Sequence, residues 1–261
     1  MDSSSFSFVP VLIGLGVVAF MLVRQRKLVA QQRLDYAQYG LGDVAAKLGM
    51  TVVDGNPALN LMLVHQEHQD TKAEGHGGLL GKAMGDSAKE TRGRAVGTVW
   101  ERPYELAYFQ RTEVDHGLAQ TTTSLWFELS LGAKTRVACP AFEIVMRNPP
   151  AYCEPKIKTA LPPQSTGNAS LDSILVVKTQ DPRLAAALVP ALIPMMSMGS
   201  IHLVGGGAEV RAYGTRVTYM TIVQNAVTFQ RALEHIACII EGRPTSHVDG
   251  QAPAQASARP S

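Results

Sequence analysis

Residues 95–139 read AVGTVWERPYELAYFQRTEVDHGLAQTTTSLWFELSLGAKTRVAC, and this stretch decides the fold. It is rich in the β-branched and aromatic residues that fit a pleated sheet. Short turn-forming groups divide it at Arg102-Pro103, at Asp115–Gly117 and at Gly132-Ala133. The pattern predicts antiparallel strands joined by tight turns, over residues 95–101, 104–114, 118–131 and 135–139.

The flanking segments add helices and further strands. Residues 28–50 have helical character, with a break expected at 40–42 and a second short helix over 44–48 that Gly49 ends. Residues 222–240 carry an apolar stripe at helical spacing before Gly242. Asp181-Pro182 is typical of a helix start, with an N-cap followed by proline. The order predicts an α+β fold, with a mainly antiparallel sheet and helices packed on one side. Further strands are expected at 142–146, 171–178, 200–204, 208–212 and 215–220.

The start of the chain predicts a membrane anchor. Residues 6–23 read FSFVPVLIGLGVVAFMLV, without a charged side chain, and are long enough to cross the hydrocarbon core of a bilayer. No basic residue precedes this run and four follow it, so the positive-inside rule places the N-terminus outside and the rest in the cytoplasm. A buried helix of a soluble protein is the alternative interpretation. The four basic residues expected to contact the membrane surface are Arg24, Arg26, Lys27 and Arg33.

Three parts are therefore expected along the chain. Residues 1–27 are the transmembrane anchor with its basic collar, and residues 28–242 are a cytoplasmic α+β domain with a mobile loop near 66–94. Residues 243–261 contain few large apolar residues and are expected to be a disordered tail. A net charge of +2 gives no general argument for nucleic-acid binding.

The segment GHGGLLGKA, residues 75–83, resembles a nucleotide-binding loop at first sight. A Walker loop needs glycine five residues before the Gly-Lys pair and a hydroxyl directly after it. His76 and Ala83 occupy those two positions. We therefore expect no bound nucleotide, and no other motif in the chain suggests a cofactor.

Possible catalytic or metal-binding residues lie in two places. His65, His68 and His76 fall within a short stretch, but zinc also needs further ligands at fixed geometry, and whether this loop binds a metal stays open. Cys139 precedes a proline at a strand end and could be an exposed thiol. Neither HExxH nor GxSxG occurs in the chain. A membrane-tethered hydrolase or metal-dependent enzyme, with a site near His65, His68 and Cys139, is thus the alternative to a non-enzymatic protein.

Several short motifs resemble those of uncharacterised bacterial proteins with one N-terminal membrane span and a cytoplasmic α+β domain. The resemblance covers most of residues 42–242 and implies a fold and a membrane location, with no activity attached. The segments that carry it are VAAKLGM at 44–50, RGRAVG at 92–97, the threonines at 121–123 and FEIV at 142–145.

Together these features favour a non-enzymatic, single-pass inner-membrane protein. Its lipid contact is expected through residues 6–23, and its cytoplasmic domain is expected to bind a protein or lipid partner close to the bilayer.

The orientation can be tested with reporters fused after Ser261. A reporter that matures only in the cytoplasm should be active, and one that requires the periplasm should be silent, because the basic collar follows the apolar run. The reverse result would contradict the proposed topology and place the three cysteines in an oxidising compartment.

Overall fold

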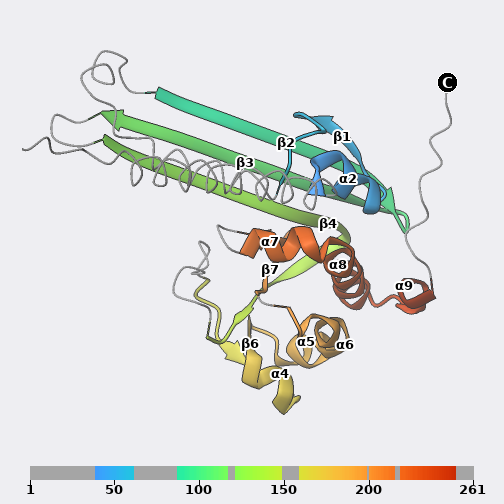
Figure 1. The fold of residues 1–261 in the computed structure, drawn as a ribbon. Coiled ribbons are helices and arrows are strands. Elements are labelled where there is room, and N and C mark those ends of the chain that lie inside the picture. The colour runs from blue at the N-terminus through green and yellow to red at the C-terminus, as the bar shows by residue number, and fades with distance from the viewer. Residues whose placement is uncertain are drawn as a thin grey trace, which may run out of the picture. The chain divides into compact units, whose positions relative to one another are not determined.

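Residues 39–61, 87–116, 121–148, 159–198, 200–214 and 218–250 are described in a computed structural model of the chain (Figure 1). Every strand pairing among them is antiparallel, which confirms the α+β class and the mainly antiparallel sheet. The strands are β1 (Thr51–Asp54), β2 (Ser87–Val99), β3 (Arg102–His116), β4 (Thr121–Met146), β5 (Pro163–Gln164), β6 (Leu175–Thr179) and β7 (His202–Gly214). The helices are α2 (Leu41–Lys47), α4 (Ala169–Ile174), α5 (Pro182–Ala187), α6 (Val189–Leu192), the 3-10 helix η3 (Ile193–Met195), α7 (Thr218–Gln224), α8 (Ala226–Glu241) and α9 (Ser246–Gly250).

The expected membrane segment, residues 6–23, lies outside the described residues, as do the collar residues that follow it. Among the helices that are described, none is both long and apolar enough to span a bilayer.

Strand β4 holds the sheet together. Its first part pairs with β3, residues 129–134 also pair with β7, and residues 142–146 lie between β6 and β7. Register shifts on either side of Cys139 separate these two regions. A single strand of 26 residues thus replaces the three shorter strands expected between 118 and 146.

Glycines expected at a turn or between two strands lie inside strands β4 and β7. Gly132 is paired with Glu105 on one side and Arg211 on the other. Gly205 lies under the ring of Phe142, where an added Cβ would come within 2.0 Å of ring carbon Cε1. The turn expected at Gly132-Ala133 does not form, and residues 205–207, which separate the strands expected at 200–204 and 208–212, continue strand β7. Gly132 and Gly205 make room for a neighbouring side chain. Gly207 instead has a positive φ of 63°.

One face of the sheet is buried beneath helices. Ala95, Leu106, Leu131 and Ala212 form a row across β2, β3, β4 and β7, and each is almost fully buried. Helices α7 and α8 pack against β4 and β7. Helix α2 covers the same face of β2, because Leu41 contacts the position of Gly93, two residues from Ala95.

The closing helix expected over 222–240 is divided into α7 and α8 at Asn225, and Gly242 ends α8 with φ +63°. Its apolar stripe is buried as expected at Phe229 and at Leu233. Two polar residues of α8, Gln230 and Glu234, are fully buried as well.

Four segments differ from the sequence-based expectations. Residues 87–94, expected in a mobile loop, belong to β2. Residues 169–174 form α4, capped by the Asn168 side chain, before the strand expected over 171–178 begins at 175. Residues 218–220, expected at the end of a strand over 215–220, are the first residues of α7. Residues 246–250, expected in a disordered tail, form α9, in which Val248 is buried.

The turn between β2 and β3 consists of Trp100 and Glu101, with φ of 50° and 61°. Such two-residue turns favour asparagine and glycine, since positive φ is costly for other residues. Both side chains make contacts here. The Trp100 ring meets Tyr104 edge-on, with 6.4 Å between ring centroids, and Glu101 forms an ion pair with Arg136 at 3.2 Å.

Phe229 tests whether α8 stabilises the core. Phe229→Ala should lower the free energy of unfolding by about 3–5 kcal/mol, the range for a buried aromatic side chain that leaves a cavity. Denaturant unfolding of the full-length protein measures the loss. Phe109→Ala, at a half-buried position on β3, is the matched control and should cost clearly less. Equal losses would show that α8 is not the principal cover of the sheet.

Candidate binding site on the ion-pair face of the sheet

The sheet face opposite α8 carries a row of charged side chains. Side chains alternate between the faces of a strand, so the register places Glu105, Gly132 and Arg211 side by side on β3, β4 and β7. Arg94, Lys134 and Glu209 lie on the same face of their strands. We call this surface the ion-pair face and define it by Arg94, Glu105, Lys134, Glu209 and Arg211.

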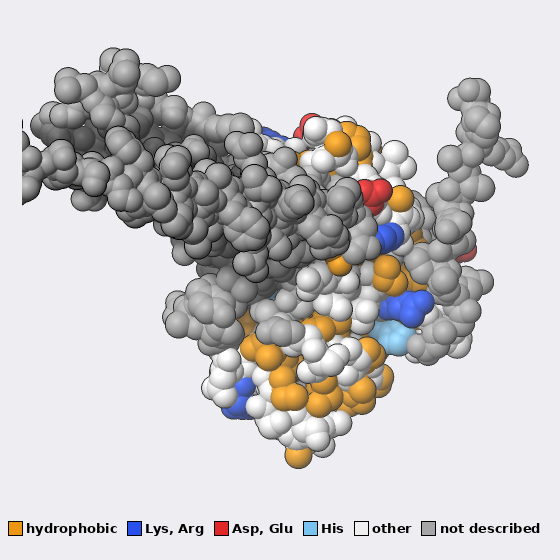
Figure 2. Space-filling view, in the orientation of Figure 1, with side chains coloured by type: hydrophobic (Ala, Val, Ile, Leu, Met, Phe, Trp, Pro, Cys, Tyr) orange, Lys and Arg blue, Asp and Glu red, His pale blue; other side chains and the backbone are white. Residues whose placement is uncertain are grey.

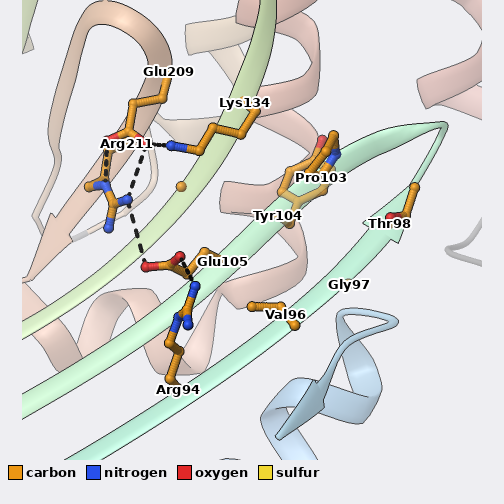
Figure 3. A pocket seen from close by; sticks show the side chains of 11 residues that line it. Arg94, Val96, Gly97, Thr98, Pro103, Tyr104, Glu105, Lys134, Glu209 and Arg211 are labelled. Carbon is orange, nitrogen blue, oxygen red and sulfur yellow. Dashed lines mark hydrogen bonds and ion pairs between the residues drawn. The ribbon is translucent and has the colours of Figure 1, made fainter. Parts of the chain in front are cut away.

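These five residues form a continuous ladder across four strands (Figure 3). Arg94 Nη2 lies 3.0 Å from Glu105 Oε2, and Glu105 Oε1 lies 3.9 Å from Arg211 Nη2. Arg211 Nε donates to Glu209 Oε1 at 3.0 Å, and Lys134 Nζ donates to Glu209 Oε2 at 2.7 Å. Three cations therefore alternate with two carboxylates.

Charge pairing sets the ionisation of the inner members. Partial burial opposes the ionisation of Glu209, but hydrogen bonds from Arg211 and Lys134 outweigh it and lower the pKa of this carboxyl. Burial also opposes the charge of Arg211, and its bonds to Glu209 raise the pKa of the guanidinium nevertheless. Both groups stay charged across the physiological range.

A pocket of about 330 Å³ opens at this ladder (Figure 3). Its lining combines the five charged side chains with glycine and apolar groups, among them Val96 and Pro103. Gly132 lies in the floor of the pocket and has no side chain that would fill it. A Cβ there would lie 3.2 Å from the Arg211 guanidinium, so a side chain would force that group to shift.

A second charged cluster is buried at the start of β3, on the other face of the sheet. The Arg102 and Glu234 side chains are completely buried, and Arg102 Nε donates to Glu234 Oε2 at 2.6 Å. Arg102 also donates through Nη1 and Nη2 to both carboxylate oxygens of Glu241, at 2.6 and 2.9 Å. The Tyr104 hydroxyl donates to Glu234 Oε2 at 2.6 Å. This cluster fastens the β2–β3 hairpin to α8.

The pKa shifts in this cluster follow from burial and pairing. Burial raises the pKa of Glu234, but bonds from Arg102 and Tyr104 lower it more. Hydrogen bonds from Arg102 lower the pKa of Glu241 to about 2. Burial raises the pKa of the Cys238 thiol to about 11, and the Glu234 charge adds to this effect.

A third polar cluster surrounds the buried Glu143 of β4. Its Oε2 accepts from Lys178 Nζ at 2.9 Å and from Thr159 Oγ1 at 2.7 Å. His202 Nε2 lies 3.4 Å from the other oxygen, without hydrogen-bond geometry. Burial lowers the pKa of His202 although Glu143 opposes the shift, so this imidazole is neutral at physiological pH. The cluster joins β4, β6 and β7 across the sheet.

The space-filling view also shows apolar side chains gathered over the region of α5, α6 and η3 (Figure 2). No charged residue occurs between Leu184 and Ile201. This apolar patch lacks the polar groups that fix a ligand's orientation, so the ion-pair face is the stronger candidate. The exposed residues of the patch are Ala186, Ala187, Pro190, Ile193 and Pro194.

Of the enzyme residues considered from sequence, the structure describes Cys139 alone. Its side chain is nearly buried on β4, its thiol donates to the Pro140 carbonyl at 3.4 Å, and burial raises its pKa to about 11. A thiol in this state is a poor nucleophile at neutral pH. The residues His65, His68 and His76 lie outside the described ranges, as do residues 75–83 and Arg24, Arg26, Lys27 and Arg33.

Sequence reasoning missed the ion-pair face. The sequence contains one local indication of this face. Glu209 and Arg211 stand two positions apart in a strand, so their opposite charges lie on the same face of the sheet. The other partners come from strands whose register the sequence did not provide.

No protein-family model matches the chain, and the curated proteins and the solved structures contain no significant match to it. Fold and site geometry alone therefore define the class, an α+β domain with a mixed-charge pocket on one sheet face.

The buried and the exposed ion pairs should differ sharply in their effect on stability. Arg102→Leu leaves two buried carboxylates without their cation and should destabilise the protein by about 3–5 kcal/mol. Arg94→Leu, the matched control, removes an exposed pair that contributes at most about 1 kcal/mol. Denaturant unfolding of both variants measures the difference. Similar losses would contradict the role assigned to the buried cluster.

Proposed function

We propose that the protein is a non-enzymatic, single-pass inner-membrane protein whose cytoplasmic domain binds a protein partner near the bilayer through the ion-pair face. The anchor is residues 6–23, with the N-terminus outside. The observation that supports binding is the pocket on the sheet, where a charge ladder surrounds a floor of glycine and apolar groups.

The charge pattern favours a polypeptide over a lipid headgroup. Every cation of the ladder is already paired with a carboxylate, so an anionic phosphate would have to displace Glu105 or Glu209. A polypeptide brings charges of both signs together with apolar groups, and it can complement the ladder without breaking it. Complementary charges at a rim mainly steer association and select the partner.

The ladder is also available for binding, because the stability of the fold depends little on it. Arg94 and Lys134 are about half exposed, and exposed ion pairs contribute little to folding. The enzyme alternative receives no comparable support, since Cys139 is a buried thiol with a raised pKa.

A photo-crosslinking residue at Thr98, an exposed residue of the pocket, tests this function in native membranes. Ser173 on α4, also exposed and small, is the matched control position. We expect a discrete protein adduct from position 98 and none from position 173.

The double variant Arg94→Gln with Lys134→Gln sharpens the test, because it removes the two half-exposed cations of the ladder while Glu105 and Glu209 keep Arg211 as their partner. The adduct should be lost while the unfolding transition stays close to that of the parent. Crosslinking to lipid alone would overturn protein binding in favour of a headgroup. Absence of any adduct from position 98 would overturn the proposed site.

A further inference from the structure

Three side chains that commonly bind transition metals converge where α8 meets α9. Glu234 and Cys238 are one turn apart on α8, and His247 lies on α9. Glu234 Oε1 lies 3.3 Å from Cys238 Sγ and 3.2 Å from His247 Nε2, and Cys238 Sγ lies 4.0 Å from His247 Nε2. The three donor atoms thus form a small triangle.

The distances between the three donor atoms are close to those between the ligand atoms of a tetrahedral zinc ion. Zinc–ligand bonds to carboxylate, imidazole and thiolate of about 2.0–2.3 Å place neighbouring ligand atoms roughly 3.3–3.6 Å apart. The three observed separations lie within about half an ångström of that range. One ion could therefore contact all three donors after small side-chain shifts, with a fourth position left for water.

The charges balance for a divalent ion. Arg102 pairs with both Glu234 and Glu241, so its single positive charge offsets one of these two carboxylates. The other carboxylate and a Cys238 thiolate then supply two negative charges, once the metal has displaced the thiol proton. Thiolate with imidazole favours zinc over magnesium or calcium, which prefer oxygen ligands.

The surrounding residues already orient these donors. Tyr104 and Arg102 Nε both donate to Glu234 Oε2 at 2.6 Å. The other oxygen, Oε1, faces Cys238 and His247 and accepts only a longer bond, of 3.4 Å, from Arg102 Nη2. Metal-binding carboxylates are commonly held by hydrogen bonds of this kind. The Trp100 ring packs edge-on against His247, with 6.4 Å between ring centroids. The His247 side chain is 30% exposed, which gives an ion a route from solvent.

We propose that Glu234, Cys238 and His247 bind one zinc ion, which fastens α9 to α8. This site is separate from the ion-pair face, and its test measures metal binding instead of partner binding.

The test uses full-length protein, purified and stripped of metal with a chelator. Added Co²⁺ should give the near-ultraviolet charge-transfer band of a cobalt–thiolate bond at one ion per chain, and Zn²⁺ should abolish the band by competition. Cys238→Ser should remove the band, while the matched controls Cys139→Ser and Cys153→Ser should retain it. Tyr104→Phe should weaken zinc binding about 10–100-fold, as loss of an orienting partner does.

His247→Ala keeps the test decisive if Cys238→Ser does not fold, because His247 is partly exposed and its loss leaves the core intact. It should weaken zinc binding by more than about 100-fold, beyond the effect of losing an orienting partner. The proposal is overturned if no micromolar zinc binding is found, or if His247→Ala binds like the parent. It is also overturned if replacing His65, His68 and His76 removes the binding.

Discussion

The structure depends on the buried pairing of Arg102 with Glu234 and Glu241. Burying an arginine and two carboxylates carries a large desolvation cost, which is offset only when each charge is closely paired. The guanidinium also donates to the Lys134 carbonyl of β4, so one side chain joins β3, β4 and α8. Because the pKa of Glu241 is lowered in the folded state, its stabilisation is present above its ordinary pKa of 4.5 and is lost as the pH falls toward 2.

Much of the fold could be predicted from local signals in the sequence. Alternating strands around residues 95–114, the Asp181-Pro182 helix start and the stop at Gly242 each rest on neighbouring residues, and the structure has all three. The sequence-based prediction of turns at glycine residues was less successful. Whether glycine marks a turn or lies beneath a side chain depends on the facing strand, as for Gly205 under Phe142, and that partner is distant in sequence.

The candidate sites depend on distant partners even more strongly. Helical periodicity does not reveal that Glu234 is buried, because its burial depends on Arg102, 132 positions away, and on Tyr104. The ladder from Arg94 to Lys134 likewise requires the register of four strands. By contrast, the proposal of a membrane anchor rests on local composition and flanking charge, for which the sequence alone suffices.

The length of β4 has a consequence for synthesis on the ribosome. The β2–β3–β4 meander uses contacts between neighbouring segments, and it can form as soon as residue 146 has emerged. Its partner β7 ends about 70 residues later, which corresponds to several seconds of translation at roughly 5–20 residues per second. Throughout that interval the second edge of β4 presents unpaired backbone groups, the feature that promotes association between chains. Nascent chains of this protein therefore pass through a period in which shielding by a chaperone would matter most.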